Sequence, residues 1–558
     1  MAQYYITTPI YYVNDRPHIG HCYTTTVADV AARFHRMFGR DVFFLTGTDE
    51  HADKVVSTAS ERGLSPLQWA DQNAAEFIKA FAALNISHDD FIRTSQDRHK
   101  DKVATYIRRL QANDDIYLGE YAGWWDPSQE EYLTETVAKG AGFKSPVTGR
   151  ELVRRSEKCY FFRLSKYQDR LAKHIEANPD FILPEARRNE VLGRFRGEGL
   201  KDIPVSRPVT DDAATQWGIR MPDDPSHRIY VWIDALFNYL SAVDTPDRRD
   251  FWPPSVHLLA KDILWFHAVI WPCMLFAMNE ALPRTVYAHS YFVRDGRKMS
   301  KSLGNFIDLE VIAAYCEKYG RDAFRWFLAT QGPLHNTDSD FSHTKFVEVY
   351  NADLANGLGN ATSRVGNMID KYFGGKVPDP KGVSQLNGAD GKPLAEFDWP
   401  TIIHKHVSAS IAKADAFDIA GALGEGVALV KKVDAYINAT EPFKLAKKLS
   451  PAEGTDGGFA DSPERDRLAA ILYHCAEALR VAIMIHSPAV PDAAERMYAG
   501  WSCHPPIGKG HSFAHVAEWN LDHTGTHHSL KPGQALTKGA ILFMRADPAD
   551  AAPGAVAG

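Results

Sequence analysis

The sequence predicts an α/β domain in its first 345 residues and an all-helical domain after them. In the first part, short apolar runs at 41–45, 256–260 and 285–288 alternate with segments of helical spacing. This alternation is typical of parallel strands joined by helices. From about residue 345 onward, apolar residues recur mainly at helical spacing. A length of 558 residues also exceeds what one hydrophobic core usually serves.

The composition is that of an ordinary globular protein. Hydrophobic residues make up 45% of the chain and charged residues 24%. The formal net charge is -7, so nucleic-acid binding would depend on local basic patches. No apolar run of about 18 residues is visible, so no membrane span is expected.

The N-terminus and the cysteines favour a cytoplasmic location. The chain leads directly into a strand pattern, without a basic leader. Its six cysteines are scattered and form no Cys-x-x-Cys pair. This spacing fits a reducing compartment and argues against a disulfide framework or a cysteine zinc site.

A Pro-His-Ile-Gly-His turn separates the first predicted strand from the first predicted helix. Residues 4–8 are β-branched or aromatic and are bounded by a proline, whereas residues 27–38 have helical spacing. His18 and His21 therefore lie at a helix N-terminus, whose free N–H groups suit a phosphate. Gly20 would let a ligand approach the backbone. A histidine pair at a turn is, by itself, more often structural than catalytic.

Two further polar stretches belong with this turn. Lys-Met-Ser-Lys-Ser occupies 298–302, and alone it reads as a solvated basic loop. The stretch 46–51 follows the strand pattern of 41–45. It would face the ligand crevice of an open α/β sheet, or it would cap the next helix. Neither a Walker P-loop nor G-x-G-x-x-G is present, so a nucleotide site of those types is excluded.

The His-Ile-Gly-His and Lys-Met-Ser-Lys-Ser motifs together resemble those of class I aminoacyl-tRNA synthetases. Other stretches resemble the methionyl-tRNA synthetases in particular, and the resemblance extends to about residue 545. These stretches are Pro9–Asn14, Thr48–His51, Tyr160–Tyr167, Tyr230–Ala235 and Lys261–Ile263.

The resemblance implies an α/β Rossmann-like class I synthetase catalytic domain with a connective insertion, followed by an all-α anticodon-binding domain. The longer bacterial homologues carry a C-terminal tRNA-binding dimerisation domain that this sequence lacks, which favours a monomer. The expected parts are the catalytic halves at 1–115 and 229–289, the insertion at 116–228, a stem-contact region with the Lys-Met-Ser-Lys-Ser loop at 290–350, the anticodon domain at 351–545 and a disordered tail at 546–558.

The activity implied is that of a methionine–tRNA ligase with ATP, L-methionine and tRNA(Met) as partners. Negative charge gathers on phosphate during activation, so catalysis needs preorganised positive partners, with Mg²⁺ carried in on ATP. By resemblance, the catalytic residues are His18, His21, Lys298 and Lys301, and Gly20, Met299, Ser300 and Ser302 join them in binding ATP.

The resemblance also implies a pocket for the methionine side chain. A thioether packs well against aromatic edges, and Asp49 would hold the α-ammonium group. By spacing alone, the aromatic residues are more simply core residues. Leu236 stands where the family commonly has proline. The expected pocket residues are Ile10, Tyr12, Trp232, Ala235, Tyr239, Ile263, Phe266 and His267.

Anticodon reading is expected from the helical domain. Asn360 and Arg364 match the family helix that meets the CAU anticodon, and both offer hydrogen-bond groups suited to bases. Phe443 follows Pro442, where the family usually has a tryptophan that stacks on a base. The alternative is that Phe443 is a core residue at a helix start.

The insertion is expected to hold no structural zinc. Many relatives carry a cysteine knuckle here, but its ligand positions are Asp126, Gln129, Ser145 and Thr148 in this chain. These are poor zinc ligands. Another metal is disfavoured, because only the aspartate brings charge. Packing of Trp124, Trp125, Tyr132 and Phe143 would hold the module instead.

Three other functions stay open at this stage. One is a tRNA-independent adenylyl-forming relative, which would not need the helical half. Another is a non-catalytic tRNA-binding relative, which would be expected to lose parts of the two motifs. The third is an inhibitor-resistant or specialised second copy of the enzyme.

Overall fold

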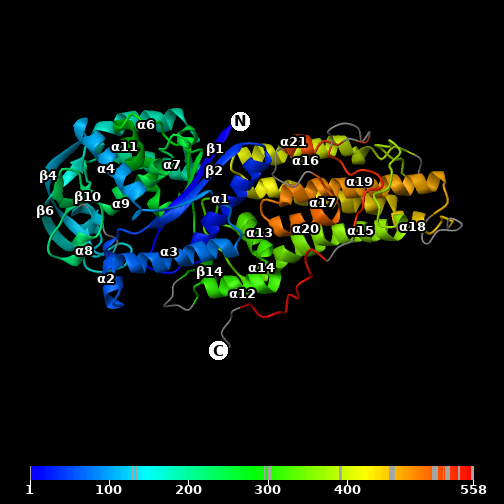
Figure 1. Cartoon of the computed structure of the whole chain (residues 1–558), viewed down its shortest axis with the longest axis horizontal. Coiled ribbons are helices and arrows are strands. Elements are labelled where there is room, and N and C mark those ends of the chain that lie inside the picture. The colour runs from blue at the N-terminus through cyan, green and yellow to red at the C-terminus, as the bar shows by residue number, and fades with distance from the viewer. Residues whose placement is uncertain are drawn as a thin grey trace.

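The computed structural model describes residues 2–553 except 129–130, 134, 198, 295, 300–304, 389–391, 451–458, 505–512, 520, 522–527 and 538–540. The molecule is elongated, with an α/β half at one end and a helical half at the other (Figure 1). The predicted fold class is confirmed.

A six-stranded parallel sheet forms the centre of the α/β half, in the order β3-β2-β1-β12-β13-β7. The chain builds outward from β1 in one direction and later returns to β1's other side. The order therefore reverses between β1 and β12, which is where open α/β sheets bind ligands. The strands are β1 Gln3–Tyr12, β2 Asp41–Asp49, β3 Asp90–Arg93, β7 Ile182–Leu183, β12 Val256–Ala260 and β13 Thr285–His289.

Two of these strands differ from expectation. The first strand was predicted to end at Pro9 but continues to Tyr12, with a shift of register between Thr7 and Ile10. The pairing shift accommodates the proline, which cannot donate a ladder hydrogen bond. The short strand β7 lies within the predicted insertion, yet it pairs with β13 at the edge of the main sheet.

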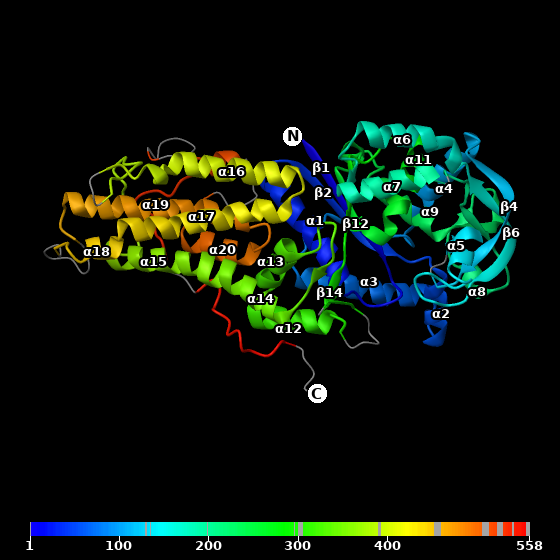
Figure 2. The ribbon, with the colours of Figure 1, turned by 180° about the vertical axis from the view of Figure 1, so that it is seen from behind.

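Helices cover both faces of the sheet, as the two opposite views show (Figures 1 and 2). The first helix is almost wholly buried between the sheet and α13. The apolar segment after β12 is not one regular helix but a short 3₁₀ turn, a π-helical turn and an α-helix in succession. The helices are α1 Ile19–Met37, α2 Asp53–Glu61, α3 Pro66–Ala83, α4 Asp97–Ala112, α9 Val231–Leu236, α10 Asn238–Ser241, the π-helix Phe266–Ile270 and α11 Trp271–Ala277.

The insertion contains two small sheets. One has the order β5-β4-β6-β8 and the other β10-β11-β9. Its strands are β4 Ile116–Asp126, β5 Glu131–Leu133, β6 Val153–Phe162, β8 Ile203–Pro204, β9 Ser206–Pro208, β10 Arg220–Met221 and β11 Asp224–Ile229, and its helices are α5 Glu135–Gly140, α6 Gln168–Ala177, α7 Glu185–Gly197 and α8 Ala213–Gln216.

The connecting region and the helical half follow. A three-stranded sheet, β15-β14-β16, precedes a bundle in which α17 and α19 pack together. The elements are β14 Phe292–Arg294, β15 Arg297–Lys298, α12 Leu309–Tyr319, α13 Arg321–Gln331, β16 Ser339–Asp340, α14 His343–Val349, the π-helix Tyr350–Gly359, α15 Asn360–Phe373, α16 Trp399–Asp415, α17 Ile419–Thr440, α18 Pro442–Ala446, α19 Pro463–His486, α20 Pro491–Gly500 and α21 Phe513–Val516.

Among the described residues, α19 alone is long and apolar enough to cross a membrane. This helix departs from the expectation that no apolar run of about 18 residues is present. All of its apolar window is buried inside the protein, against α15, α16, α17 and α18. The helix therefore has the burial of a core helix.

A buried arginine joins the two halves. Arg325 of α13 donates to the Asp29 carboxylate of α1 (2.7 Å) and to the carbonyl oxygens of Pro488 and Ala489, just after α19. Burial alone would raise the pKa of Asp29, but Arg325 and Arg33 outweigh it and lower that pKa to about 2. An ion pair satisfied in this way gives the halves a fixed junction.

The described part of the predicted disordered tail is packed against the protein. Asn351 donates to the carbonyl oxygen of Ala546 (3.0 Å), and Lys318 pairs with Asp550 (2.9 Å). These contacts tie residues 546–550 down, contrary to the expectation for them. Residues 554–558 lie outside the described part of the chain.

Candidate active site

The two histidines of the first motif cap α1, as predicted. The backbone N–H of Gly20 donates to Nδ1 of His18 (3.0 Å), and that of His18 donates to Nδ1 of His21 (3.2 Å). Burial, and after it the neighbouring His18, lower the pKa of His21 well below its usual value. The neutral His21 ring therefore carries its proton on Nε2. This proton is placed beside the helix N-terminus, where it can be offered to an anion.

Gly20 is required by His18 rather than only by a ligand. A Cβ on residue 20 would lie 2.9 Å from the His18 ring. The ring itself packs edge-on to Phe306, with centroids 5.1 Å apart. Ile19, which lies between His18 and Gly20, donates its backbone N–H to the carbonyl oxygen of Ile307 (3.1 Å). The capped helix is thereby attached to the segment that follows the second motif.

Only part of the second motif can be placed. Lys298 ends β15, where its backbone pairs with Val293, and Met299 packs against the main core. The Lys298 side chain and residues Ser300, Lys301 and Ser302 lie outside the described part of the structure.

The residues predicted to bind methionine come from three segments near the switch point of the sheet. Ile10 and Tyr12 come from the end of β1, Trp232, Ala235 and Tyr239 from α9 and α10, and Ile263, Phe266 and His267 from the segment after β12. The rings of Trp232 and Phe266 stack at 4.0 Å, and Tyr12 meets Trp232 edge-on at 5.7 Å. These three rings form one aromatic wall.

A neutral hydrogen-bonded pair forms a second part of this pocket. His267 Nδ1 donates to the Ile263 carbonyl (2.9 Å), so its Nε2 accepts from the Tyr239 hydroxyl (2.7 Å). Burial lowers the pKa of His267 to about 4, although the carbonyl contact opposes the shift. The pair is thus uncharged near pH 7, which suits an apolar thioether.

Asp49 ends β2 and is only 2% exposed. The next residue, Glu50, is fixed by the Arg93 guanidinium (2.6 Å) and by the Ser95 hydroxyl (2.5 Å). A buried carboxylate in a fixed loop at this edge of the sheet has the charge and location needed to bind an ammonium group.

A buried carboxylate behind this loop was not predicted. Asp234 of α9 bonds to Nδ1 of His51 (2.6 Å) and to Nε2 of His99 (2.7 Å). Burial would raise the pKa of Asp234, but the two imidazoles lower it. His51 and Asp234 both lie in stretches that the sequence singled out. Their pairing across 183 residues, however, has no periodic pattern that could have revealed it.

Hydroxyl groups occupy the knuckle of the insertion. Asp126 accepts from the Ser128 hydroxyl (2.5 Å), which also meets the Thr148 hydroxyl (2.7 Å), and Ser145 Oγ accepts from the backbone N–H of Thr148 (3.1 Å). The Trp124 and Phe143 rings pack at 4.5 Å. Gln129 and the Tyr132 side chain lie outside the described residues. Among described residues no group of three or more His, Cys, Asp or Glu could hold a metal, and the absence of zinc stays a prediction.

The predicted anticodon residues lie on partly open surfaces. Asn360 is exposed at the start of α15, and Arg364 is half-buried one turn later. Phe443 is half-buried in α18, so it is not a full core residue. In Figure 1, α18 lies at the end of the helical half farthest from the sheet.

Comparison with known proteins agrees with this architecture. The family model described as "tRNA synthetases class I (M)" matches residues 4–143 and 141–366. A methionine–tRNA ligase of Streptomyces coelicolor is 38% identical over 566 residues, covering 98% of both chains. This chain belongs to the class I methionyl-tRNA synthetase family.

Other members give the same result. The methionine–tRNA ligase of Bacillus subtilis is 39% identical over 511 residues, covering 89% of this chain and 72% of that one. The Mycobacterium tuberculosis methionyl-tRNA synthetase in complex with methionyl-adenylate superposes with a TM-score of 0.84 at 34% identity, covering 97% of this chain and all of that one. The family resemblance and the fold class inferred from the motifs are thereby confirmed.

Proposed function

We infer that this protein is a methionine–tRNA ligase, which activates L-methionine with ATP to methionyl-adenylate and transfers the methionyl group to the 3′ end of tRNA(Met). The observation that carries the inference is the similarity over 98% of both chains to a methionine–tRNA ligase. The contacts among the Tyr12, Trp232 and Phe266 rings, and the buried Asp49 at the end of β2, support it. Neither a tRNA-independent relative nor a non-catalytic one is supported by the comparisons.

The first step joins methionine to AMP. A carboxylate oxygen of methionine attacks the α-phosphorus of ATP, and the bond to the bridging oxygen breaks as pyrophosphate leaves. We assign the stabilisation of the phosphate charge to the Nε2–H groups of His18 and His21, to the N-terminus of α1, and to Lys298 and Lys301. Gly20, Met299, Ser300 and Ser302 complete the proposed ATP site. Mg²⁺ would enter with ATP, because it binds nucleotide phosphates readily.

In the second step, a ribose hydroxyl of the tRNA 3′ end attacks the activated carbonyl carbon, and AMP leaves. No covalent protein nucleophile is needed, so catalysis rests on orientation and charge. The carboxylate of Asp49 would hold the α-ammonium group. The wall of Tyr12, Trp232 and Phe266 and the Tyr239–His267 pair would hold the thioether, with Ile10, Ala235 and Ile263 beside them.

Other parts of the proposal concern the partners and the surroundings. Asn360, Arg364 and Phe443 would meet the anticodon, because their exposed or half-buried positions leave them accessible to bases. All six cysteines are unpaired and five are buried, which suits a reducing cytoplasm. A monomeric state and a zinc-free insertion complete the proposal, and sedimentation and metal analysis would test them.

The experiment that tests the function uses two assays on the purified protein. ATP–pyrophosphate exchange with each of the twenty amino acids should respond to methionine, and tRNA(Met) should accept methionine in a charging assay. A preference for leucine, isoleucine or valine would overturn the specificity. Exchange without charging would indicate a tRNA-independent enzyme, and neither activity would indicate a non-catalytic protein.

A further inference from the structure

The insertion contacts the loop that carries Asp49. This loop, residues 49–51, is held from within the catalytic domain by Arg93 and Asp234. From the other side, Trp217 of the insertion donates its Nε1–H to the carbonyl oxygen of Glu50 (2.5 Å). The Trp217 ring also packs edge-on to His51, with centroids 5.3 Å apart. One insertion residue therefore touches two consecutive residues of the loop.

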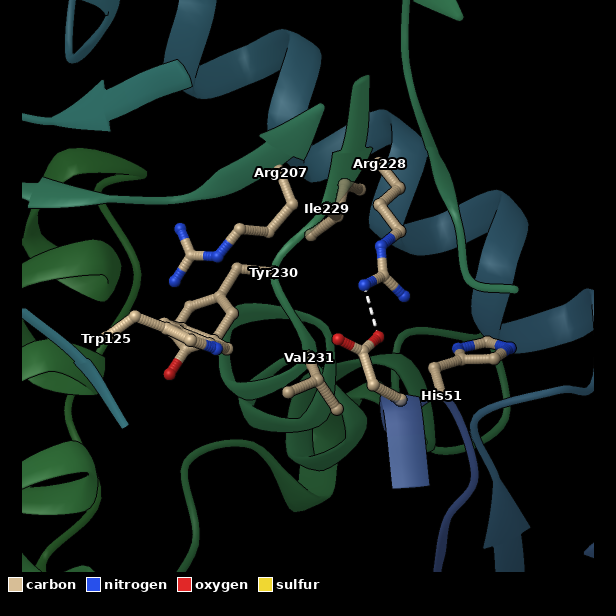
Figure 3. Close-up of a pocket in the computed structure, with 8 residues that line it drawn as sticks. His51, Trp125, Arg207, Arg228, Ile229, Tyr230 and Val231 are labelled. Carbon is tan, nitrogen blue, oxygen red and sulfur yellow. Dashed lines mark hydrogen bonds and ion pairs between the residues drawn. The ribbon is translucent and has the colours of Figure 1, made fainter. Parts of the chain in front are cut away.

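An arginine links Trp217 to the helix that follows the loop. Arg228 of β11 pairs with the carboxylate of Asp53, in the first turn of α2. Its Nη1 also donates to the carbonyl oxygens of Trp217 (2.7 Å) and Ala214 (3.1 Å). The dashed line in Figure 3 marks the ion pair, with His51 on the same side of the pocket. Arg228 thus connects Trp217, which contacts the loop, to Asp53, which lies in the helix that follows the loop.

The surroundings of Arg228 make it a structural tie and not a ligand-binding group. Its side chain is 8% exposed, and both terminal nitrogens already donate to protein oxygens. Only Nε of this buried guanidinium has no hydrogen-bond partner among the described residues, whereas Nη1 and Nη2 bind the protein's own oxygens. Removing the guanidinium would leave the Asp53 carboxylate and two carbonyl groups without their partner.

We propose that Trp217, Arg228 and Asp53 are positioning residues, through which the insertion fixes Asp49 for binding the methionine ammonium group. The proposal rests on the proposed function, because it assumes that Asp49 binds methionine. The physical reason is that ion pairs between a carboxylate and an ammonium group depend steeply on geometry. A loop free to shift would meet its ligand in many orientations. The insertion would thereby act on methionine affinity without touching methionine.

The test compares Arg228→Met and Asp53→Asn with the unmodified enzyme in methionine-dependent pyrophosphate exchange. Each variant should raise KM for methionine, Arg228→Met by about tenfold and Asp53→Asn by less, while kcat stays within about twofold. Loss of binding that is equal in the ground state and the transition state has this effect. The double variant should be less than additive, because both residues serve one contact. Calorimetric titration with methionine alone should show the same weakening.

Arg220→Met is the matched control. Arg220 lies on β10 beside β11, and it donates to Gln216 rather than to the 49–53 segment. It should leave KM for methionine unchanged. An equal rise in KM for Arg220→Met and Arg228→Met would overturn the proposal, because any disturbance of the small sheet would then suffice. So would a fall in kcat with an unchanged KM.

Two of the variants, Asp53→Asn and Asp49→Ala, separate failure of the positioning proposal from failure to fold and from failure of the proposed function. Should Arg228→Met fail to fold, Asp53→Asn decides, because the Asp53 side chain is 37% exposed and tolerates the change more easily. Asp49→Ala tests the proposed function itself. If Asp49→Ala raises KM for methionine and the Arg228 and Asp53 variants do not, the positioning proposal fails while the function stands. If the unmodified protein shows no exchange with methionine, both fail.

Discussion

The two halves of the molecule place their proposed functional residues in opposite ways. In the α/β half, Asp49, Tyr239 and His267 are all nearly buried, and each is fixed by its own strand or by a hydrogen bond. In the helical half, Asn360 is exposed, and Arg364 and Phe443 are half-buried. Small ligands need a closed and preorganised site, whereas a large nucleic acid needs accessible groups on a rigid frame. Substitutions in the α/β half should therefore impair both activities, and those in the helical half should impair charging alone.

The largest effect is expected at Lys301. Lys301→Ala should raise the activation free energy of methionyl-adenylate formation by on the order of 3 kcal/mol, because the charge that Lys301 stabilises develops in the transition state. Methionine binding should change little. Pyrophosphate exchange measures the first quantity and equilibrium dialysis the second. An unchanged rate of activation would remove the loop from the catalytic machinery.

Asp49→Ala should lower kcat/KM for methionine by an amount equivalent to about 2 kcal/mol of lost stabilisation, since it leaves the ammonium group of methionine without its partner. The loss should appear in exchange and in charging alike. Asp71→Ala serves as the control, because that carboxylate pairs with the other side of Arg93 and is exposed. Equal losses in the two variants would show that the effect is not specific to Asp49.

Acid should destabilise both halves together. Burial lowers to about 4 the pKa of His267 and His289 in one half, and of His474 and His486 in the other. Their unfolded value is about 6.5, so between pH 6.5 and 4 the unfolded chain binds more protons. The contribution of these histidines to the free energy of unfolding is therefore fully present above pH 6.5 and is lost as the pH drops towards 4.

Denaturant titrations at pH 7 and pH 5 would measure this loss. His474→Gln should lose less stability between the two pH values than the unmodified protein, because one titrating group is gone. Equal stability at both pH values would contradict the neutral state of these histidines.

A smaller and selective effect is expected in the helical half. Phe443→Ala should reduce charging of tRNA(Met), because the loss of an aromatic ring that stacks on a base weakens tRNA binding by about 1–3 kcal/mol. Pyrophosphate exchange should remain at the level of the unmodified enzyme. If both activities fall together, the substitution has disturbed the fold and not anticodon recognition.

No effect at all is expected from removing zinc. Treatment with a chelator, followed by restoration of Mg²⁺, should leave exchange unchanged, since Asp126, Ser145 and Thr148 already bond to neighbouring groups of the knuckle. One equivalent of tightly held zinc, lost together with activity, would overturn this prediction.

The sequence by itself determined the elements and the location of the main motifs. Strand and helix periodicities placed a strand at residues 256–260, where β12 lies, helices after about residue 345, and His18 at the start of the first helix. These features follow from neighbours within one or two turns, whose spacing is written directly in the chain. The resemblance then supplied the pocket residues, and the structure joins six of them, Tyr12, Trp232, Phe266, Tyr239, His267 and Ile263, through ring contacts and hydrogen bonds.

Only the tertiary structure decided which distant polar groups meet. Arg228 pairs with Asp53 across 175 residues, and Arg325 reaches Asp29 across 296. The two-residue strand β7 joins the main sheet although insertion residues precede and follow it. A polar side chain has the same local pattern whether it lies in water or in a buried ion pair. Its partner is chosen by the path of the whole chain and by the requirement that a buried charge be satisfied.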